Sequence, residues 1–120
     1  MSEGSTDEPE DTPDDVLDVE TSAGSEGTTV TVRGEVDAHT ADTLRHHLEG
    51  VGAGTVVRLD LSGVGFMDSS GLRVLIAAKR RSVEGGGDVK VVAASRPLTR
   101  LFEIAGVADH LGLDARDDAS

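Results

Sequence analysis

Strand-like and helix-like segments alternate along most of this chain. Val56–Leu61 (VVRLDL) has a high apolar content, as expected for a strand that is covered on both faces. The stretch from Ser69 to about Val83 instead repeats apolar residues at helical spacing and places its arginines away from them. Connections of the strand–helix–strand type favour parallel strands and right-handed crossovers. The alternation therefore predicts a single α/β domain in which helices cover a sheet of four or five strands.

Glycine and proline mark the ends of the predicted elements. Gly34 follows the β-branched run TTVTVR, and Gly85–Gly87 follows the long helix. Ser95 with Pro97 marks the start of another helix, because proline is tolerated in a first turn. A short strand is also expected near Val16. The other predicted strands are 28–33, 56–61, 89–93 and a short one at 110–113, and the predicted helices are 40–50, 69–83 and 95–105.

Composition and charge narrow the classes of function. The chain has 120 residues, no cysteine and a net charge of -12. The absence of cysteine excludes disulfides and thiolate metal sites. The negative charge opposes binding to nucleic acids and to anionic membranes, because both attract Lys and Arg. There is no apolar run long enough to cross a bilayer and no basic, apolar leader. We therefore expect a cytoplasmic protein with no nucleic-acid and no membrane partner.

The negative charge is concentrated at the amino end. Residues 1–20 hold nine carboxylates and no Lys or Arg. Residues 1–14 are too polar to bury the apolar surface that would offset the entropy lost on ordering them. We therefore divide the chain into a disordered acidic tail (1–14), one folded domain (15–113) and a frayed carboxyl end (114–120).

The segment Leu59–Leu72, LDLSGVGFMDSSGL, is the most informative part of the sequence. It holds the end of a buried strand, a glycine-containing loop and the start of an amphipathic helix, with Asp68 and Ser69 where the helix begins. An Asp or Ser oxygen there can accept hydrogen bonds from the first free amides of the helix, which stabilises it by about 1 kcal/mol. The same position suits a phosphorylated serine, since the amino end of a helix favours an anion. The pattern alone does not decide between a structural helix cap and a phosphorylation site.

Three segments resemble the STAS family in their order and spacing. The most specific is LDLS followed by FMDSSGL at Phe66–Leu72. The other two are GEVD at Gly34–Asp37, before the first helix, and LFEIAGV at Leu101–Val107. Together they cover roughly Val16–Leu113. Compared with the family pattern, we expect the acidic tail to be an addition and the last helix often seen in the family to be short or missing. The resemblance implies an α/β domain with a mixed sheet and three to four helices packed mainly on one face.

Within that family the sequence is similar to bacterial anti-sigma factor antagonists, which implies a binding protein and not an enzyme. Such an antagonist, when unphosphorylated, binds an anti-sigma factor that is also a serine kinase, and thereby releases the sigma factor. The kinase supplies ATP and Mg²⁺ and phosphorylates the serine after the motif aspartate, which is Ser69 here. Phosphorylation weakens the complex, and a separate serine phosphatase resets it. The resemblance implies no cofactor and no metal, and a monomer is the default.

The resemblance also assigns candidate contact residues to this sequence. Asp37 and Asp68 match acidic positions of the family's contact surface. Ser70, beside Ser69, is the runner-up phosphorylation site. The predicted partner-binding residues are Asp37, His39, Asp68, Ser69, Ser70, Gly71 and Arg73, and no residue is predicted to be catalytic.

Other classes of function fit the residues less well. Ser69 lacks the G-x-S-x-G elbow of a serine hydrolase, and no histidine has an evident relation to it. A two-component receiver needs an acidic pair for Mg²⁺ and a late lysine, and neither is recognisable. His46 and His47 are adjacent, so they point to different helix faces and make a poor metal pair. The alternative that stays open is a STAS binding module of another assembly, a stress-signalling or lipid-transport complex, without control of a sigma factor.

Overall fold

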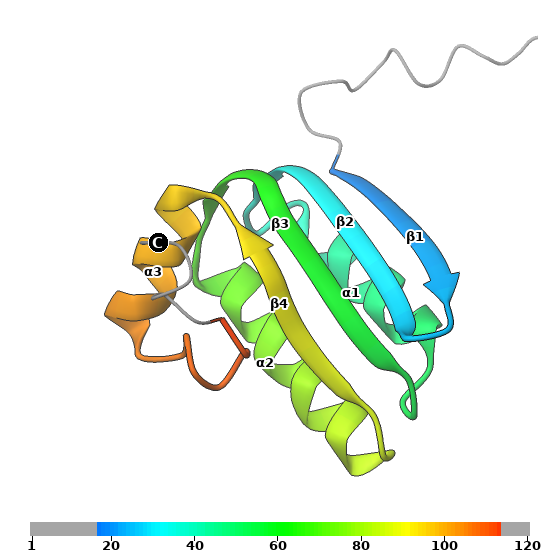
Figure 1. Ribbon diagram of the computed structural model, residues 1–120. Coiled ribbons are helices and arrows are strands. Elements are labelled where there is room, and N and C mark those ends of the chain that lie inside the picture. The colour runs from blue at the N-terminus through cyan, green and yellow to red at the C-terminus, as the bar shows by residue number, and fades with distance from the viewer. Residues whose placement is uncertain (1–16, 114–120) are drawn as a thin grey trace, which may run out of the picture.

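The computed structural model describes residues 17–113. They contain a four-stranded sheet with the strand order β1-β2-β3-β4 (Figure 1). β1 (Asp18–Gly24) pairs antiparallel with β2 (Gly27–Val36), and β3 (Val56–Met67) pairs parallel with both β2 and β4 (Asp88–Ala94). Parallel neighbours need crossover connections, which helices supply here. The predicted α/β fold with a mixed sheet of four to five strands is confirmed.

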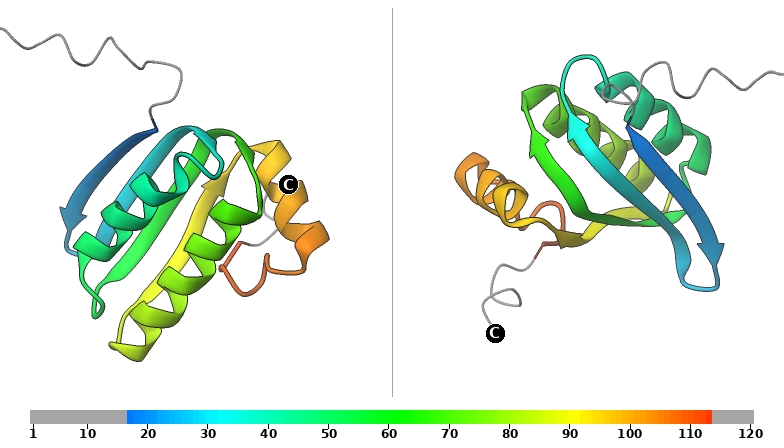
Figure 2. Two further views of the ribbon diagram at one scale, coloured as in Figure 1. Left: turned by 180° about the vertical axis from the view of Figure 1, so that it is seen from behind. Right: turned by 90° about the horizontal axis from the view of Figure 1, so that it is seen from above.

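Helices make the crossovers between the parallel strands. α1 (Ala41–Val51) connects β2 to β3, and α2 (Ser69–Glu84) connects β3 to β4. α3 (Arg96–Ala105) follows β4 and ends at Gly106, whose φ of 76° is left-handed. Figures 1 and 2 show α1 and α2 side by side on one face of the sheet and α3 at its β4 side. Helices packed mainly on one face, as predicted, are therefore what this part of the chain contains.

The core between the sheet and the helices is built from aliphatic side chains. Val30 and Val32 on β2, and Leu59 and Leu61 on β3, have no exposed surface. Phe102, on α3, is the one aromatic side chain buried among them in the described part of the chain. Because all of these groups leave water together, their burial is the main favourable term for folding.

Two strands are longer than the sequence predicted. β2 continues through Gly34 to Val36, and β3 continues through the glycine-containing stretch to Met67. The register between them shifts twice, and at each shift β3 carries one more residue than β2. Gly34 has a φ of 118°, and Gly63 lies so close to Arg33 that a Cβ would be 2.9 Å from the arginine Cγ. The glycines that predicted a loop therefore let the strands bulge and stay paired.

The short strand predicted at 110–113 is wrong, because these residues form turns. The leucines there are nevertheless buried, and the Val91 N–H of β4 donates a hydrogen bond of 2.7 Å to the Leu111 carbonyl. The segment covers part of the outer edge of β4, which protects that edge from pairing with another chain. The predicted tail (1–14) and frayed end (114–120) lie outside the described residues.

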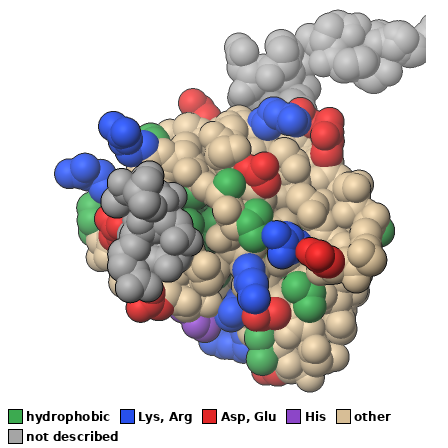
Figure 3. Space-filling view, viewed as in Figure 1, with side chains coloured by type: hydrophobic (Ala, Val, Ile, Leu, Met, Phe, Trp, Pro, Cys, Tyr) green, Lys and Arg blue, Asp and Glu red, His purple; other side chains and the backbone are tan. Residues whose placement is uncertain are grey.

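The face of the sheet opposite α1 and α2 carries mixed charges. Figure 3 shows basic, acidic and apolar side chains interspersed over it. Arg33 on β2 lies 3.3 Å from Asp18 and 3.8 Å from Glu20, both on β1. Such exposed pairs are worth about 0–1 kcal/mol each. The residues that the sequence singled out lie instead where β2 and β3 end.

Candidate functional site

The helix start that holds the DSSG motif is capped by its aspartate. Asp68 is the N-cap residue of α2, and its carboxylate accepts a hydrogen bond of 2.8 Å from the Ser70 N–H. The Asp68 carbonyl accepts from the N–H groups of Gly71 and Leu72. One aspartate thus satisfies several of the amides that a helix leaves free at its start. The capping role that the sequence left open belongs to Asp68.

Ser69 occupies the first position of α2 and is exposed. Among the described residues, its hydroxyl makes no hydrogen bond. Ser70 is half-buried, and Arg73 is exposed one helical turn after Ser69. The hydroxyl of Ser69 is therefore free for a partner to reach, and it has no structural task that a modification would disturb.

Gly71 lets α2 sit close to the strand ends. The residue is buried, and a Cβ placed on it would lie 2.6 Å from the Met67 Cγ and 2.7 Å from the Val36 Cγ1. Both distances are shorter than any normal carbon–carbon contact. The glycine in the motif thus serves close packing of the helix against β2 and β3, and its backbone has an ordinary negative φ.

A second loop, between β2 and α1, is held by Asp37. Its carboxylate accepts hydrogen bonds from the N–H groups of His39 (2.9 Å) and Thr40 (3.1 Å). The Thr40 hydroxyl, which is buried, donates to the Glu35 carbonyl at 2.8 Å and accepts from the Asp37 N–H at 3.0 Å. The hydrogen bond from the Thr40 N–H is the largest cause that lowers the pKa of Asp37 below its ordinary value. Asp37 therefore presents a fixed, ionised carboxylate.

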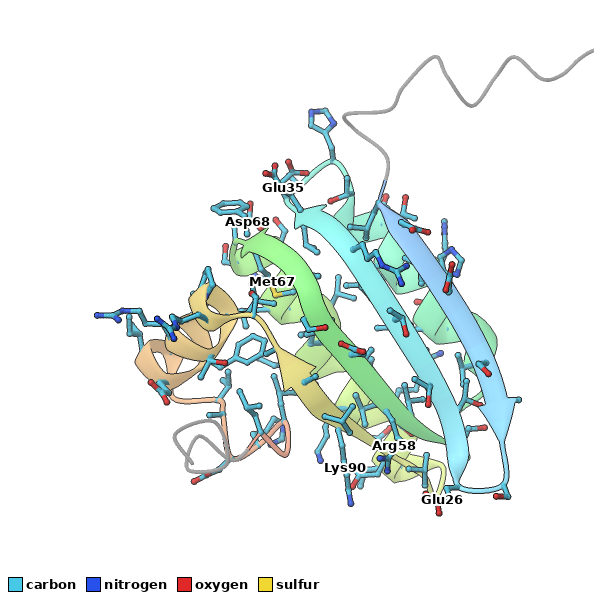
Figure 4. The ribbon with its side chains drawn as sticks, turned by 45° about the horizontal axis from the view of Figure 1, so that its top comes forward. Glu26, Glu35, Arg58, Met67, Asp68 and Lys90 are labelled. Atoms are coloured by element: carbon cyan, nitrogen blue, oxygen red, sulfur yellow. The ribbon has the colours of Figure 1, made fainter. Side chains whose placement is uncertain are left out.

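The two loops lie at the same edge of the sheet, because the carboxyl ends of parallel strands meet there. The Asp68 N–H donates a hydrogen bond of 3.1 Å to the Val36 carbonyl, which joins the end of β3 to the end of β2. Figure 4 shows Glu35, Met67 and Asp68 together at this edge, while Glu26, Arg58 and Lys90 lie at the opposite end. We call the edge made by Glu35, Asp37, Asp68 and Ser69 the switch edge. His39 is exposed beside it.

None of the hollows described in residues 17–113 is lined by Glu35, Asp37, Asp68 or Ser69. Hollows of about 330 Å³ and 420 Å³ lie elsewhere, the first beside α3 and the second between α1 and β1. His46 and His47 line the second hollow, but residues 17–113 hold no group of three or more His, Cys, Asp or Glu placed to bind a metal ion. No helix in that range is both long and apolar enough to cross a bilayer. An exposed edge of this kind is open to contact with another protein, in which its charged groups would suit the polar rim of the interface.

Sequence reasoning missed two residues of this edge. Glu35 and Phe66 are paired in register across β2 and β3, and both are exposed, while their neighbours Val36 and Met67 are buried. Side chains alternate between the faces of a strand, so the burial of one pair sends the other to the opposite face. The alternation of buried and exposed residues could have predicted this exposure, but the glycines around Phe66 indicated a loop and not a strand.

The fold and the switch edge define a class of small α/β binding modules. A family model described as "Mlab, STAS domain" matches residues 19–113. The anti-sigma-B factor antagonist of Listeria monocytogenes is 40% identical over 80 residues, which cover 65% of this chain and 70% of that protein. The corresponding protein of Bacillus subtilis is 33% identical over 90 residues, which cover 74% of this chain and 83% of that protein. The chain belongs to the STAS domain family, which confirms the resemblance found in the sequence.

A solved structure is similar over most of the chain. The crystal structure of an anti-sigma factor antagonist from Mycobacterium paratuberculosis superposes with a TM-score of 0.72 at 28% identity. The match covers 82% of this chain and 86% of that chain. The similarity therefore extends over more than four-fifths of each chain.

Proposed function

We propose that this protein is an anti-sigma factor antagonist controlled by phosphorylation of Ser69. The unphosphorylated form binds an anti-sigma factor that is also a serine kinase, and the sigma factor is thereby released. The names of the relatives support this assignment, since each is an antagonist of an anti-sigma factor. The exposed, unbonded hydroxyl of Ser69 at the start of α2 is the observation that carries it.

The proposed reaction takes place on Ser69 and is catalysed by the partner. The Ser69 oxygen attacks the γ-phosphorus of ATP, the bond to ADP breaks, and the hydroxyl proton leaves to a base of the kinase. ATP and Mg²⁺ belong to the kinase, and a serine phosphatase later hydrolyses the phosphoserine. The antagonist itself is then a cytoplasmic binding protein, monomeric and not an enzyme, with no cofactor, nucleic acid or membrane among its partners.

Phosphorylation changes the surface more than the fold. A phosphate on Ser69 adds about -1.5 to -2 charges where the free amides and dipole of α2 accept an anion, so the helix stays formed. The same charge lies next to Asp68, whose carboxylate caps α2, and at the same edge as Asp37, which strengthens the negative potential of the switch edge. A partner surface matched to the neutral hydroxyl would have to bury that charge, which opposes binding.

Ser69 is a better acceptor than its neighbours. Ser70 is half-buried and its N–H is held by Asp68, which keeps it the runner-up. Ser62, also exposed, donates its hydroxyl to the Asp60 carboxylate at 2.6 Å. The alternative function, a STAS module of another assembly without sigma-factor control, would not require an accessible serine at this place.

The test is phosphopeptide mapping after incubation of the full chain with ATP in a lysate of the cells that make it. Wild type, Ser69→Ala and the control Ser70→Ala are compared. We expect phosphate on Ser69 in the wild type and in Ser70→Ala, and none in Ser69→Ala. Ser69→Asp is then expected to bind the purified kinase more weakly than wild type. A lysate with active kinase that leaves Ser69 unmodified would favour the alternative assembly.

A further inference from the structure

Phe66 is an exposed aromatic side chain at the switch edge. The chain has two phenylalanines and no Tyr or Trp. Phe102 is fully buried, but Phe66 has 48% of its surface exposed. Because the neighbouring Met67 points into the core, Phe66 points toward the uncovered face of the sheet, two residues before the N-cap of α2.

Three carboxylates belong to the same strand ends as this ring. Glu35 is its register partner on β2, Asp68 comes two residues later as the N-cap of α2, and the Asp37 loop follows the end of β2, which is hydrogen-bonded to Asp68. None of the ion pairs found among residues 17–113 involves Glu35, Asp37 or Asp68. The strand ends that carry the ring therefore also carry three carboxylates without a salt bridge in the described part of the chain.

The other exposed apolar side chains lack this setting. They are aliphatic and lie on other elements: Ile104 is 77% exposed on α3, Val83 50% near the end of α2, Val92 44% on β4 and Val56 37% at the start of β3. Single exposed apolar residues are normal on protein surfaces and need no explanation. What distinguishes Phe66 is its aromatic ring together with its continuity with the phosphorylation site at Ser69.

We propose that Phe66 is the apolar anchor of the kinase complex, and that the kinase receives it in an apolar pocket bordered by Lys and Arg side chains. This inference rests on the proposed function, and it adds the chemistry of the partner surface. Aromatic side chains buried at the centre of an interface dominate binding free energies, while charges at the rim set the rate of association. A phosphate on Ser69 would bring a charge to the border of the pocket, which explains why a single modification weakens the whole contact.

The experiment measures binding by calorimetry to the purified anti-sigma factor serine kinase that phosphorylates the wild-type chain. ADP replaces ATP, so that no phosphoryl group is transferred. Phe66→Ala is compared with Val92→Ala, a matched control with similar exposure away from the switch edge. We expect Phe66→Ala to raise Kd by about 10-fold or more and Val92→Ala to change it by less than about threefold. Equal Kd values for Phe66→Ala and wild type would contradict the proposed role of Phe66 as an anchor.

Two further measurements distinguish a loss of binding caused by the missing ring from one caused by a destabilised fold or by a wrong proposed function. Thermal unfolding of Phe66→Ala should match the wild type, since the ring is half exposed; a large loss of stability together with weak binding would overturn the anchor in favour of a packing role. Glu35→Gln should slow association at low salt and flatten its salt dependence if the pocket is bordered by cations. If no such kinase phosphorylates or binds the wild type, the proposed function fails, and this inference fails with it.

Discussion

The starts of α1 and α2 use the same residue types in opposite ways. Both helices follow a parallel strand, and an aspartate and a hydroxyl residue lie at each start: Asp37 and the N-cap Thr40 at α1, and the N-cap Asp68 and Ser69 at α2. At α1 the hydroxyl of Thr40 is buried and hydrogen-bonded to the Glu35 carbonyl. At α2 the Asp68 carboxylate caps the helix, and the hydroxyl of Ser69 is left exposed. One hydroxyl is thus a part of the fold, and the other is available for a signal.

The largest effect is expected where α2 touches the strand ends. Gly71→Ala should destabilise the fold by about 1–3 kcal/mol, because its methyl would overlap Met67 and Val36. Gly50→Ala is the matched control: it lies inside α1 with nothing within 4 Å of the added methyl, and it should stabilise by about 1 kcal/mol. Urea unfolding measures both. Stabilisation by both substitutions would show that α2 does not pack as closely as described.

The second-largest loss of stability is expected from removing the buried hydroxyl of Thr40 at the start of α1. Thr40→Val keeps the shape of the side chain but removes the donor to the Glu35 carbonyl and the acceptor of the Asp37 N–H. Buried polar groups left without a partner cost about 1–3 kcal/mol, so we expect a loss of about 2 kcal/mol in the free energy of unfolding. A change below about 0.5 kcal/mol, measured in the same urea series, would remove the contrast between the two helix starts.

The overall pattern of elements was predictable because it depends on local periodicity. The apolar stripe of α2, the buried run of β3 and the left-handed Gly106 after α3 are each read from a few neighbouring residues. The Asp68 cap was also among the readings of the motif. The full length of β3 could not be predicted from the local pattern, because it depends on contacts between strands. β3 continues past its glycines because β2 stays paired with it through two register shifts.

The same limit applies to the switch edge. Asp37, Asp68, Ser69 and Gly71 were found from the motif, and the structure brings them to one edge. Thr40 is the N-cap residue of α1, but its hydroxyl bonds to a carbonyl five residues earlier and not to an amide of the helix, which only the folded loop determines. The exposure of Phe66 likewise follows from the pairing of β2 with β3 beyond Gly34. Both features depend on contacts between segments that the local sequence pattern does not determine.

The cap of α2 should have a smaller effect than Thr40. Asp68→Ala removes the acceptor of the Ser70 N–H and should cost about 1 kcal/mol of stability. Asp68→Asn is the control, because asparagine caps helices about as well as aspartate, and it should stay within about 0.5 kcal/mol of wild type. If both variants lose the same stability, the charge of Asp68 and not its hydrogen bond is what holds α2.

Asp37 should make the α1 loop sensitive to pH. Its pKa is lowered in the folded chain, chiefly by the Thr40 N–H, so ionised Asp37 favours folding above the unfolded pKa of about 3.9. This contribution is lost as the pH falls through the lower folded pKa. Asp37→Asn should therefore unfold at a lower temperature than wild type near neutral pH, and the gap should narrow in acid. Melting curves across that range measure the gap, and a gap that does not depend on pH would contradict a role for the charge.

The smallest effect on stability belongs to the residue with the largest proposed effect on function. Ser69→Ala removes a hydroxyl that makes no hydrogen bond in the described chain and places a strong helix former at the first position of α2. The free energy of unfolding should change by less than about 0.5 kcal/mol, against about 2 kcal/mol for Thr40→Val. Urea unfolding of the two variants side by side tests the contrast directly. A loss above about 1 kcal/mol in Ser69→Ala would make its hydroxyl a structural group like that of Thr40, and phosphorylation there would then act by disturbing the fold instead of the surface.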